Sequence, residues 1–143
     1  MKTILVTGGV GYIGSVAVKA LLDKGYSVVV VDNLSKGKKE LVDSRAKLFE
    51  LDLVDDLDSV FSEGIDSVIH FASYKAVEES MTDAVKYSDN ILGTVNLLNA
   101  MVKFNVKKII FSSTASVYGM PSVDVLTEET PVNPINYYGF TKL

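Results

Sequence analysis

The chain contains no cysteine, which excludes disulfide bonds, thiolate metal sites and cysteine nucleophiles. This absence fits a reducing compartment. No apolar run approaches membrane-spanning length, and the apolar run at residues 4–6 gives way to Thr7-Gly8-Gly9 too early for a secretory signal. We therefore expect a cytoplasmic protein with no membrane partner.

A general excess of basic charge is also lacking, since the net charge is −4 and the 14 basic residues, all lysines except Arg45, are dispersed apart from one short run. Lys36, Lys38 and Lys39 form a short run that is typical of a solvated loop, so nucleic acid is not an expected partner. With 48% apolar and 22% charged residues, the 143-residue chain is expected to form one globular domain over residues 1–143.

Short apolar runs alternate with longer amphipathic segments along the chain. This alternation predicts an α/β fold, a doubly wound parallel sheet of order 3-2-1-4-5 in the manner of a Rossmann fold. The run Val28–Val31 is typical of a strand buried on both faces. The predicted strands are residues 4–7, 27–31, 47–51, 67–71 and 108–112, and the predicted helices are residues 13–24, 55–61, 82–104 and one that opens near residue 135.

Two of the predicted helices show apolar residues at helical spacing. Val16, Ala20 and Leu21 share one stripe in the first helix. Ile91, Val95, Leu98 and Val102 follow a helical period in the long third helix, which Asn105 can end.

A glycine-rich turn follows the first predicted strand and opens the first helix. Gly8, Gly11 and Gly14 are spaced three apart, and glycine there lets backbone amides approach a pyrophosphate at a helix N-terminus. A plain strand-to-helix turn would explain the glycines alone. Asp32, however, closes the second strand 18 residues after Gly14, where a carboxylate accepts from ribose hydroxyls and repels a 2′-phosphate. We therefore predict a site for NAD rather than NADP.

Chemistry is indicated at the other end of the chain, where Tyr138 and Lys142 are four residues apart. On a helix this spacing places both side chains on one face, and an ammonium beside a phenol favours the phenolate. Such a tyrosine is a good general acid and base for an alcohol proton. The Ser112-Ser113-Thr114 cluster leaves the fifth strand, where a hydroxyl can hold a substrate oxygen, although such clusters are often turn formers.

Other polar residues carry weaker signals. Asp52 ends the third strand, and spacing alone does not separate an adenine contact from a helix cap. His70 is the only histidine and lies within an apolar strand, so we interpret it as structural. No set of residues forms a convincing metal site, and none is predicted.

Taken together, these motifs resemble the extended short-chain dehydrogenase/reductase family, and within it the UDP-glucose (UDP-galactose) 4-epimerase branch. The resemblance implies NAD-dependent epimerisation at C4 of a UDP-hexose through a transient 4-keto sugar. Family enzymes are more than twice this long, so it also implies that this chain is an N-terminal, cofactor-binding part that is inactive or nearly so alone. The segments that carry the resemblance are residues 6–15, 32–34, 70–77, 111–119 and 138–142.

Residue by residue, the resemblance assigns roles in two sites. Thr114, Tyr138 and Lys142 act on the sugar. Tyr138 and Lys142 are also assigned to cofactor binding, with Lys142 at the nicotinamide ribose. The remaining matches concern NAD. The pyrophosphate is covered by Gly8, Gly11, Tyr12, Ile13 and Gly14; the adenosine end by Asp32, Asn33, Leu34, Ser35, Lys36, Gly37, Asp52 and Leu53; and the pyrophosphate and nicotinamide side by Phe71, Ala72, Ser73, Lys75 and Asn90.

Three positions depart from the family pattern. Ser73 replaces a smaller residue, Glu78 replaces a common glycine, and Thr114 replaces a serine while keeping the hydroxyl. Two alternatives remain open: a nucleotide-sugar dehydratase or other nucleotide-sugar epimerase, and a non-catalytic dinucleotide-binding module. Dehydratases usually show Thr-Asp-Glu where this chain has Ser113-Thr114-Ala115. The expected partners are a UDP-sugar substrate and a second copy of the chain in a homodimer.

Overall fold

A computed structural model describes residues 1–143, and the chain divides into two compact units. The first unit comprises Met1–Ser73 and Leu92–Ser112, and the second comprises Tyr74–Ile91 and Ser113–Leu143. No helix is both long and apolar enough to cross a membrane.

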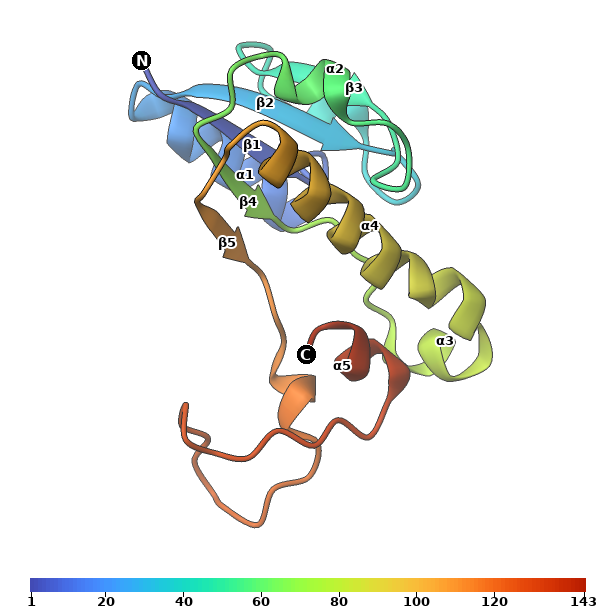
Figure 1. Ribbon diagram of the computed structural model, residues 1–143. Helices are drawn as coiled ribbons and strands as arrows, with labels where there is room; N and C mark the ends of the chain where they lie inside the picture. The colour runs from blue at the N-terminus through green and yellow to red at the C-terminus, as the bar shows by residue number, and fades with distance from the viewer. The chain divides into compact units, whose positions relative to one another are not determined.

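The first unit is built on a sheet of five parallel strands (Figure 1). The strands lie in the order β3-β2-β1-β4-β5, which confirms the predicted doubly wound sheet and its order. Their bounds agree with the predicted ranges to within about one residue at each end. They are β1 (Thr3–Thr7), β2 (Ser27–Asp32), β3 (Lys47–Glu50), β4 (Ser67–His70) and β5 (Ile109–Phe111).

Alternate residues of the central strands enter two separate hydrophobic cores. Val28 and Val30 of β2 join one core with Val18 of α1 (Tyr12–Asp23), while Val29 and Val31 join the other. This second core includes α2 (Asp58–Phe61) and Leu97 of α4 (Ala84–Lys103). The four consecutive valines are at most 3% exposed, as expected for a strand covered on both faces. A short 3-10 helix, η1 (Lys39–Leu41), precedes β3.

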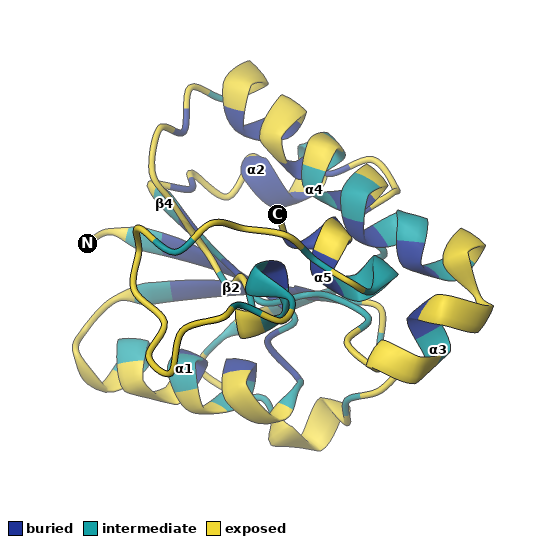
Figure 2. Ribbon diagram, turned by 90° about the horizontal axis from the view of Figure 1, so that it is seen from below, coloured by how far each residue is buried: buried dark blue, intermediate teal, exposed yellow.

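The stripe of Val16, Ala20 and Leu21 in the first helix is only partly packed, since Leu21 lies against the core whereas Val16 and Ala20 are exposed. Val16 is 63% exposed, and the buried residues of α1 are Gly14 and Val18; Figure 2 shows the exposed outer side of this helix. The cause is the contact at Gly14, where an added Cβ would lie 2.1 Å from the carbonyl oxygen of Gly8. That close approach fixes the rotation of α1 about its axis and turns Val16 towards solvent.

The predicted helix over residues 82–104 is present as α4, which begins two residues later and ends one residue earlier. A separate short helix, α3 (Val77–Thr82), precedes it and is not among the predicted helices. Asp83 lies between them, and its side chain accepts a hydrogen bond from the backbone N–H of Lys86 at 3.1 Å. An aspartate that caps a new helix in this way ends the preceding one.

The apolar residues at helical spacing in α4 do not form its buried face. Val95, Leu98 and Val102 are 50%, 42% and 81% exposed. The buried stripe consists instead of Tyr87, Asn90, Gly93, Leu97, Ala100 and Met101. Because Gly93, Ala100 and Asn90 are small or polar, this buried stripe is less hydrophobic in sequence than the exposed one. The spacing of apolar residues therefore points to the exposed face of α4.

The second unit contains α3, the first part of α4, a 3-10 helix η2 (Ala115–Tyr118) and α5 (Tyr137–Thr141). Residues 122–129 are exposed throughout (Figure 2). Few apolar side chains are buried here, Tyr87 and Val117 among them, whereas Ser80, Asn90, Thr141 and Lys142 are all buried. Polar contacts therefore supply most of the order in this unit.

Candidate functional site

Packing explains Gly8 and Gly14, two of the three glycines spaced three apart after β1. Gly8 has a φ of +72°, and a Cβ there would lie 2.7 Å from the backbone nitrogen of Ala72. Gly14 is excluded from carrying a side chain by the carbonyl of Gly8. These two residues let the turn, the start of α1 and the end of β4 approach closely.

Gly11 differs, because the nearest atom to its added Cβ is the Gly8 carbonyl oxygen at 3.3 Å and no other lies within 4 Å. It is the N-cap of α1, no side chain caps this helix, and no acidic residue lies in its first turn. Tyr12 and Ile13, the first two residues of the helix, are 84% and 60% exposed. An uncapped helix N-terminus beside a glycine fits a phosphate anion.

Asp32 organises the loop that follows β2. Its carboxylate accepts hydrogen bonds from the backbone N–H of Val10 at 3.2 Å and of Leu34 at 2.9 Å. Leu34 takes a positive φ of 58°, and Gly37 lies so close to Val10 that a Cβ would approach its Cγ2 to 2.3 Å. The loop carrying Ser35 and Lys36 is thus held against the glycine turn, and both of those side chains are exposed.

Asp52 lies beside this loop at the end of β3. The side-chain amide of Asn33 donates to its carboxylate at 2.7 Å, so these two residues are in contact just beyond the carboxyl ends of β2 and β3. Leu53 is 9% exposed and packs against Gly93, so its side chain belongs to the core. Its carbonyl accepts from the side-chain amide of Asn96 at 2.7 Å, a contact that the sequence pattern does not reveal.

The end of β4 lies next to the glycine turn. The backbone N–H groups of Phe71 and Ala72 donate to the carbonyl and hydroxyl of Thr7 at 3.1 and 3.2 Å, and Ser73 is half-buried. His70 is 1% exposed. Its Nδ1 lies 2.6 Å from the Thr7 hydroxyl and its Nε2 lies 3.0 Å from that of Thr94, so both ring nitrogens have hydroxyl partners, in keeping with a structural role.

In the second unit, Tyr138 belongs to α5 and Lys142 immediately follows that helix. Tyr138 is half-buried, whereas Lys142 is only 4% exposed. Burial lowers the pKa of Lys142 from its usual 10.5 to about 8, because desolvation disfavours the ammonium. The side chain is still protonated at neutral pH, which the predicted chemistry requires.

Thr114 and Ser113 lie at the start of η2. The hydroxyl oxygen of Thr114 accepts from the backbone N–H of Ser116 at 3.2 Å, which leaves its proton available for a substrate oxygen. The hydroxyl of Ser113 donates to the carbonyl of Lys142 at 2.8 Å. A Cβ on Gly139 would approach the carbonyl of Ser116 to 2.7 Å, so η2 and α5 are in close contact. The predicted hydroxyl cluster and the tyrosine–lysine pair thus come together.

The last two predicted cofactor residues are also in this unit. Lys75 is exposed. Asn90 is 7% exposed, and its side-chain amide accepts from the Tyr74 N–H at 2.8 Å and donates to the Tyr74 carbonyl at 2.9 Å. Asn90 also donates to the Thr141 hydroxyl at 3.1 Å. In the structure it acts on the protein backbone, and any effect on a cofactor would be indirect.

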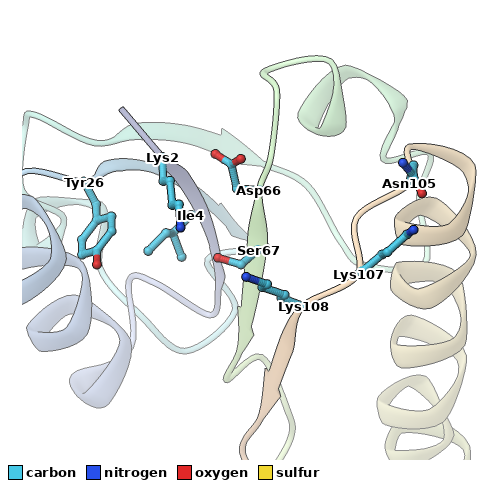
Figure 3. Close-up of a pocket in the computed structure, with 8 residues that line it drawn as sticks. All are labelled: Lys2, Ile4, Tyr26, Asp66, Ser67, Asn105, Lys107 and Lys108. Atoms are coloured by element: carbon cyan, nitrogen blue, oxygen red, sulfur yellow. The ribbon is translucent and has the colours of Figure 1, made fainter.

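A separate hollow in the first unit lies at the amino ends of the strands (Figure 3). Strand amino ends lie at the edge of a parallel sheet opposite to that of the glycine turn, so this hollow is not the predicted dinucleotide site. No group of three or more histidine, aspartate or glutamate side chains is arranged to hold a metal ion. The hollow is lined by Lys2, Ile4, Tyr26, Asp66, Ser67, Asn105, Lys107 and Lys108.

Residues 4–143 match the family described as the NAD dependent epimerase/dehydratase family. The chain belongs to this family. It is 48% identical to a UDP-glucose 4-epimerase of Bacillus subtilis over 98% of this chain and 44% of the relative. It is 50% identical to a UDP-glucose 4-epimerase of Lacticaseibacillus casei over 99% and 44%.

Solved epimerase structures show the same fold. A crystal structure of a UDP-glucose 4-epimerase superposes with a TM-score of 0.96 at 48% identity, over 99% of this chain and 44% of that one. The Brucella ovis UDP-glucose 4-epimerase in complex with NAD gives 0.95 at 40% identity, over 99% and 45%. The present chain spans somewhat less than half the length of these relatives.

Proposed function

We propose that this chain provides the NAD-binding and proton-transfer part of a UDP-hexose 4-epimerase. The observation that carries the proposal is Gly11. Added Cβ atoms at Gly8, Gly9 and Gly14 would lie within 3.0 Å of other protein atoms, whereas at Gly11 the nearest lies at 3.3 Å. Gly11 is the least crowded of these glycines and lies at an uncapped helix N-terminus, where a pyrophosphate that approaches the backbone accounts for a residue without a side chain.

The adenosine end of NAD fits the first unit as well. Both oxygens of Asp32 already accept backbone N–H groups, and a carboxylate has further lone pairs for the two hydroxyls of a ribose. A 2′-phosphate at this place would be repelled by the same charge, which favours NAD over NADP. Asn33 and Asp52 then border the adenosine.

The residues that would transfer the proton of the sugar lie in the second unit. As a phenolate, Tyr138 takes the proton from the sugar 4-hydroxyl, and the hydroxyl of Thr114 donates to the same oxygen. The Lys142 ammonium stabilises the phenolate and binds ribose hydroxyls. When bound, NAD would supply the acceptor for the C4 hydrogen as hydride and the source of its return to the opposite face of the 4-keto sugar. Tyr138 gives the proton back, so the overall reaction is an epimerisation without net redox change.

Calorimetric titration of the purified chain with NAD, and separately with NADP, tests the cofactor site. We expect saturable binding of NAD and little response to NADP. Gly11→Val should abolish NAD binding while the circular dichroism spectrum stays that of the wild type. If Gly11→Val binds NAD as tightly as the wild type does, the proposed pyrophosphate site at this helix N-terminus is wrong.

A chimera tests the chemistry. This chain is joined to the sequence that follows the matched region in the Bacillus subtilis relative, and UDP-galactose conversion is measured. Tyr138→Phe should lower turnover by at least about 100-fold while NAD stays bound, because proton transfer typically contributes factors of that size. A Tyr138→Phe chimera that retains turnover would exclude Tyr138 as the acid and base. The homodimer and the cytoplasmic location remain predictions.

A further inference from the structure

The five-residue helix α5, which carries Tyr138 and precedes Lys142, is too short to be stable by itself. Its first-turn N–H groups have no partner within the helix, as in every α-helix. The side chain of Asn136 accepts from the Gly139 N–H at 2.7 Å. The N–H groups of Tyr137 and Tyr138 are instead taken by α3, a helix more than fifty residues earlier in the sequence.

Ser80 of α3 makes the stronger of these two contacts. Its hydroxyl oxygen accepts from the Tyr138 N–H at 3.1 Å, and the hydroxyl itself donates to the Val77 carbonyl at 2.6 Å. Ser80 is 0% exposed, so water cannot replace it in either bond. Because the hydroxyl proton is committed to Val77, its lone pairs point away from that carbonyl, towards Tyr138.

The carbonyl of Tyr138 is also held. The Thr141 hydroxyl donates to it at 2.8 Å and itself accepts from the side-chain amide of Asn90 at 3.1 Å. Both backbone polar groups of Tyr138 thus have buried side-chain partners. The neighbouring Tyr137 is held through its own hydroxyl, 2.8 Å from the hydroxyl of Ser88.

We propose that Ser80 is a positioning residue for the tyrosine–lysine pair: by accepting the Tyr138 N–H from outside α5, it sets the place of that turn and of the two side chains on it. This inference rests on the proposed function for the roles of Tyr138 and Lys142, and on the two hydrogen bonds of Ser80 for the placement. Ser80 acts through the backbone and does not itself touch the substrate.

The titration of Lys142 reports the placement without any need for activity. In the chain labelled with ¹³C, the lysine Cε resonances are followed from pH 6 to pH 12, and Lys142→Met identifies the Lys142 signal. The wild-type pKa is about 8. Ser80→Ala should raise this midpoint by about one unit or more, because a displaced turn re-exposes the ammonium to water.

Ser88→Ala is the matched control, since it removes a hydroxyl bond to α5 of similar length without touching Tyr138. A purely structural loss would lower the unfolding midpoint of both variants and leave the titration of the folded Lys142 unchanged. Equal Lys142 midpoints in the wild type, Ser80→Ala and Ser88→Ala would overturn the proposal.

If Ser80→Ala does not fold, Ser80→Cys serves instead, because a thiol has a similar shape and is a much weaker acceptor. It should raise the Lys142 midpoint by a smaller amount, and an unchanged midpoint would count against the proposal. Ser80→Thr retains the hydroxyl and should restore the wild-type midpoint. These results are independent of NAD binding and of epimerase turnover, so failure of the proposed function would be recognised separately.

Discussion

In the first unit, aliphatic side chains cover both faces of a parallel sheet, whereas in the second unit buried hydroxyls and amides hold short helices. The valines of β2 illustrate the first kind of order, since each is nearly or fully buried. Ser80, Asn90 and Thr141 illustrate the second, because each is buried and each donates to or accepts from backbone groups. The stability of the first unit therefore depends on how well apolar side chains fill its core. The stability of the second unit depends on the geometry of individual hydrogen bonds.

The largest effect is expected at Gly14 in the first unit. Gly14→Ala places a Cβ about 2 Å from the Gly8 carbonyl, a backbone atom that cannot move aside, and should destabilise the chain by more than about 3 kcal/mol. Gly11→Ala is the control, with its nearest contact at 3.3 Å and an ordinary φ of −73°. Urea denaturation compares the two. Similar losses in both variants would show that packing does not distinguish these glycines.

The next effect tests which face of α4 is buried. Leu97 is 0% exposed and Leu98 is 42% exposed. Leu97→Ala should lower the free energy of unfolding by about 3 kcal/mol, because it leaves a cavity in the core, and Leu98→Ala should lower it by less than about 1 kcal/mol. The urea midpoint of Leu97→Ala should lie below that of Leu98→Ala. The reverse order would show that the face carrying Leu98 is the buried one.

Lys142 should reveal a stability cost in the second unit. Its folded pKa of about 8 lies below the unfolded value of 10.5, so between these values the unfolded chain binds more protons and stability rises with pH. At pH 7 the folded ammonium therefore costs about 2–3 kcal/mol. Lys142→Met should be more stable than the wild type at pH 7 and should lose most of the rise in stability between pH 8 and pH 10.5. Parallel pH profiles of stability for the two proteins would contradict this expectation.

The smallest effect is expected for the cap of α5. Asn136→Ala removes the side chain that accepts from Gly139 and should cost about 1 kcal/mol. Asn133→Ala, which removes an exposed side chain with no hydrogen bond while its backbone N–H still donates to Val117, should change stability by less than about 0.5 kcal/mol. Thermal unfolding at several heating rates measures both, and a neutral Asn136→Ala would mean that α3 alone orders this helix.

Much of the first unit could be predicted because its signals are local. A run of four valines, a glycine turn and an acidic strand end are each read from neighbouring residues, and chirality limits how parallel strands connect. The strand order, the glycine turn and the position of Asp32 at the end of β2 follow from these signals. The exposed Val16 and Leu98 could not be predicted in this way, because the rotation of a helix depends on what it packs against.

The sequence by itself therefore determined the parallel sheet, its strand order and the identity of the residues at its carboxyl edge, because alternation and turn chemistry are properties of short segments. Only the tertiary structure decided that Gly11 is the least crowded glycine after β1, that Lys142 is buried, and that Ser80 holds Tyr138. Those features depend on contacts between residues far apart in the chain, and such contacts leave no periodic signal in the sequence.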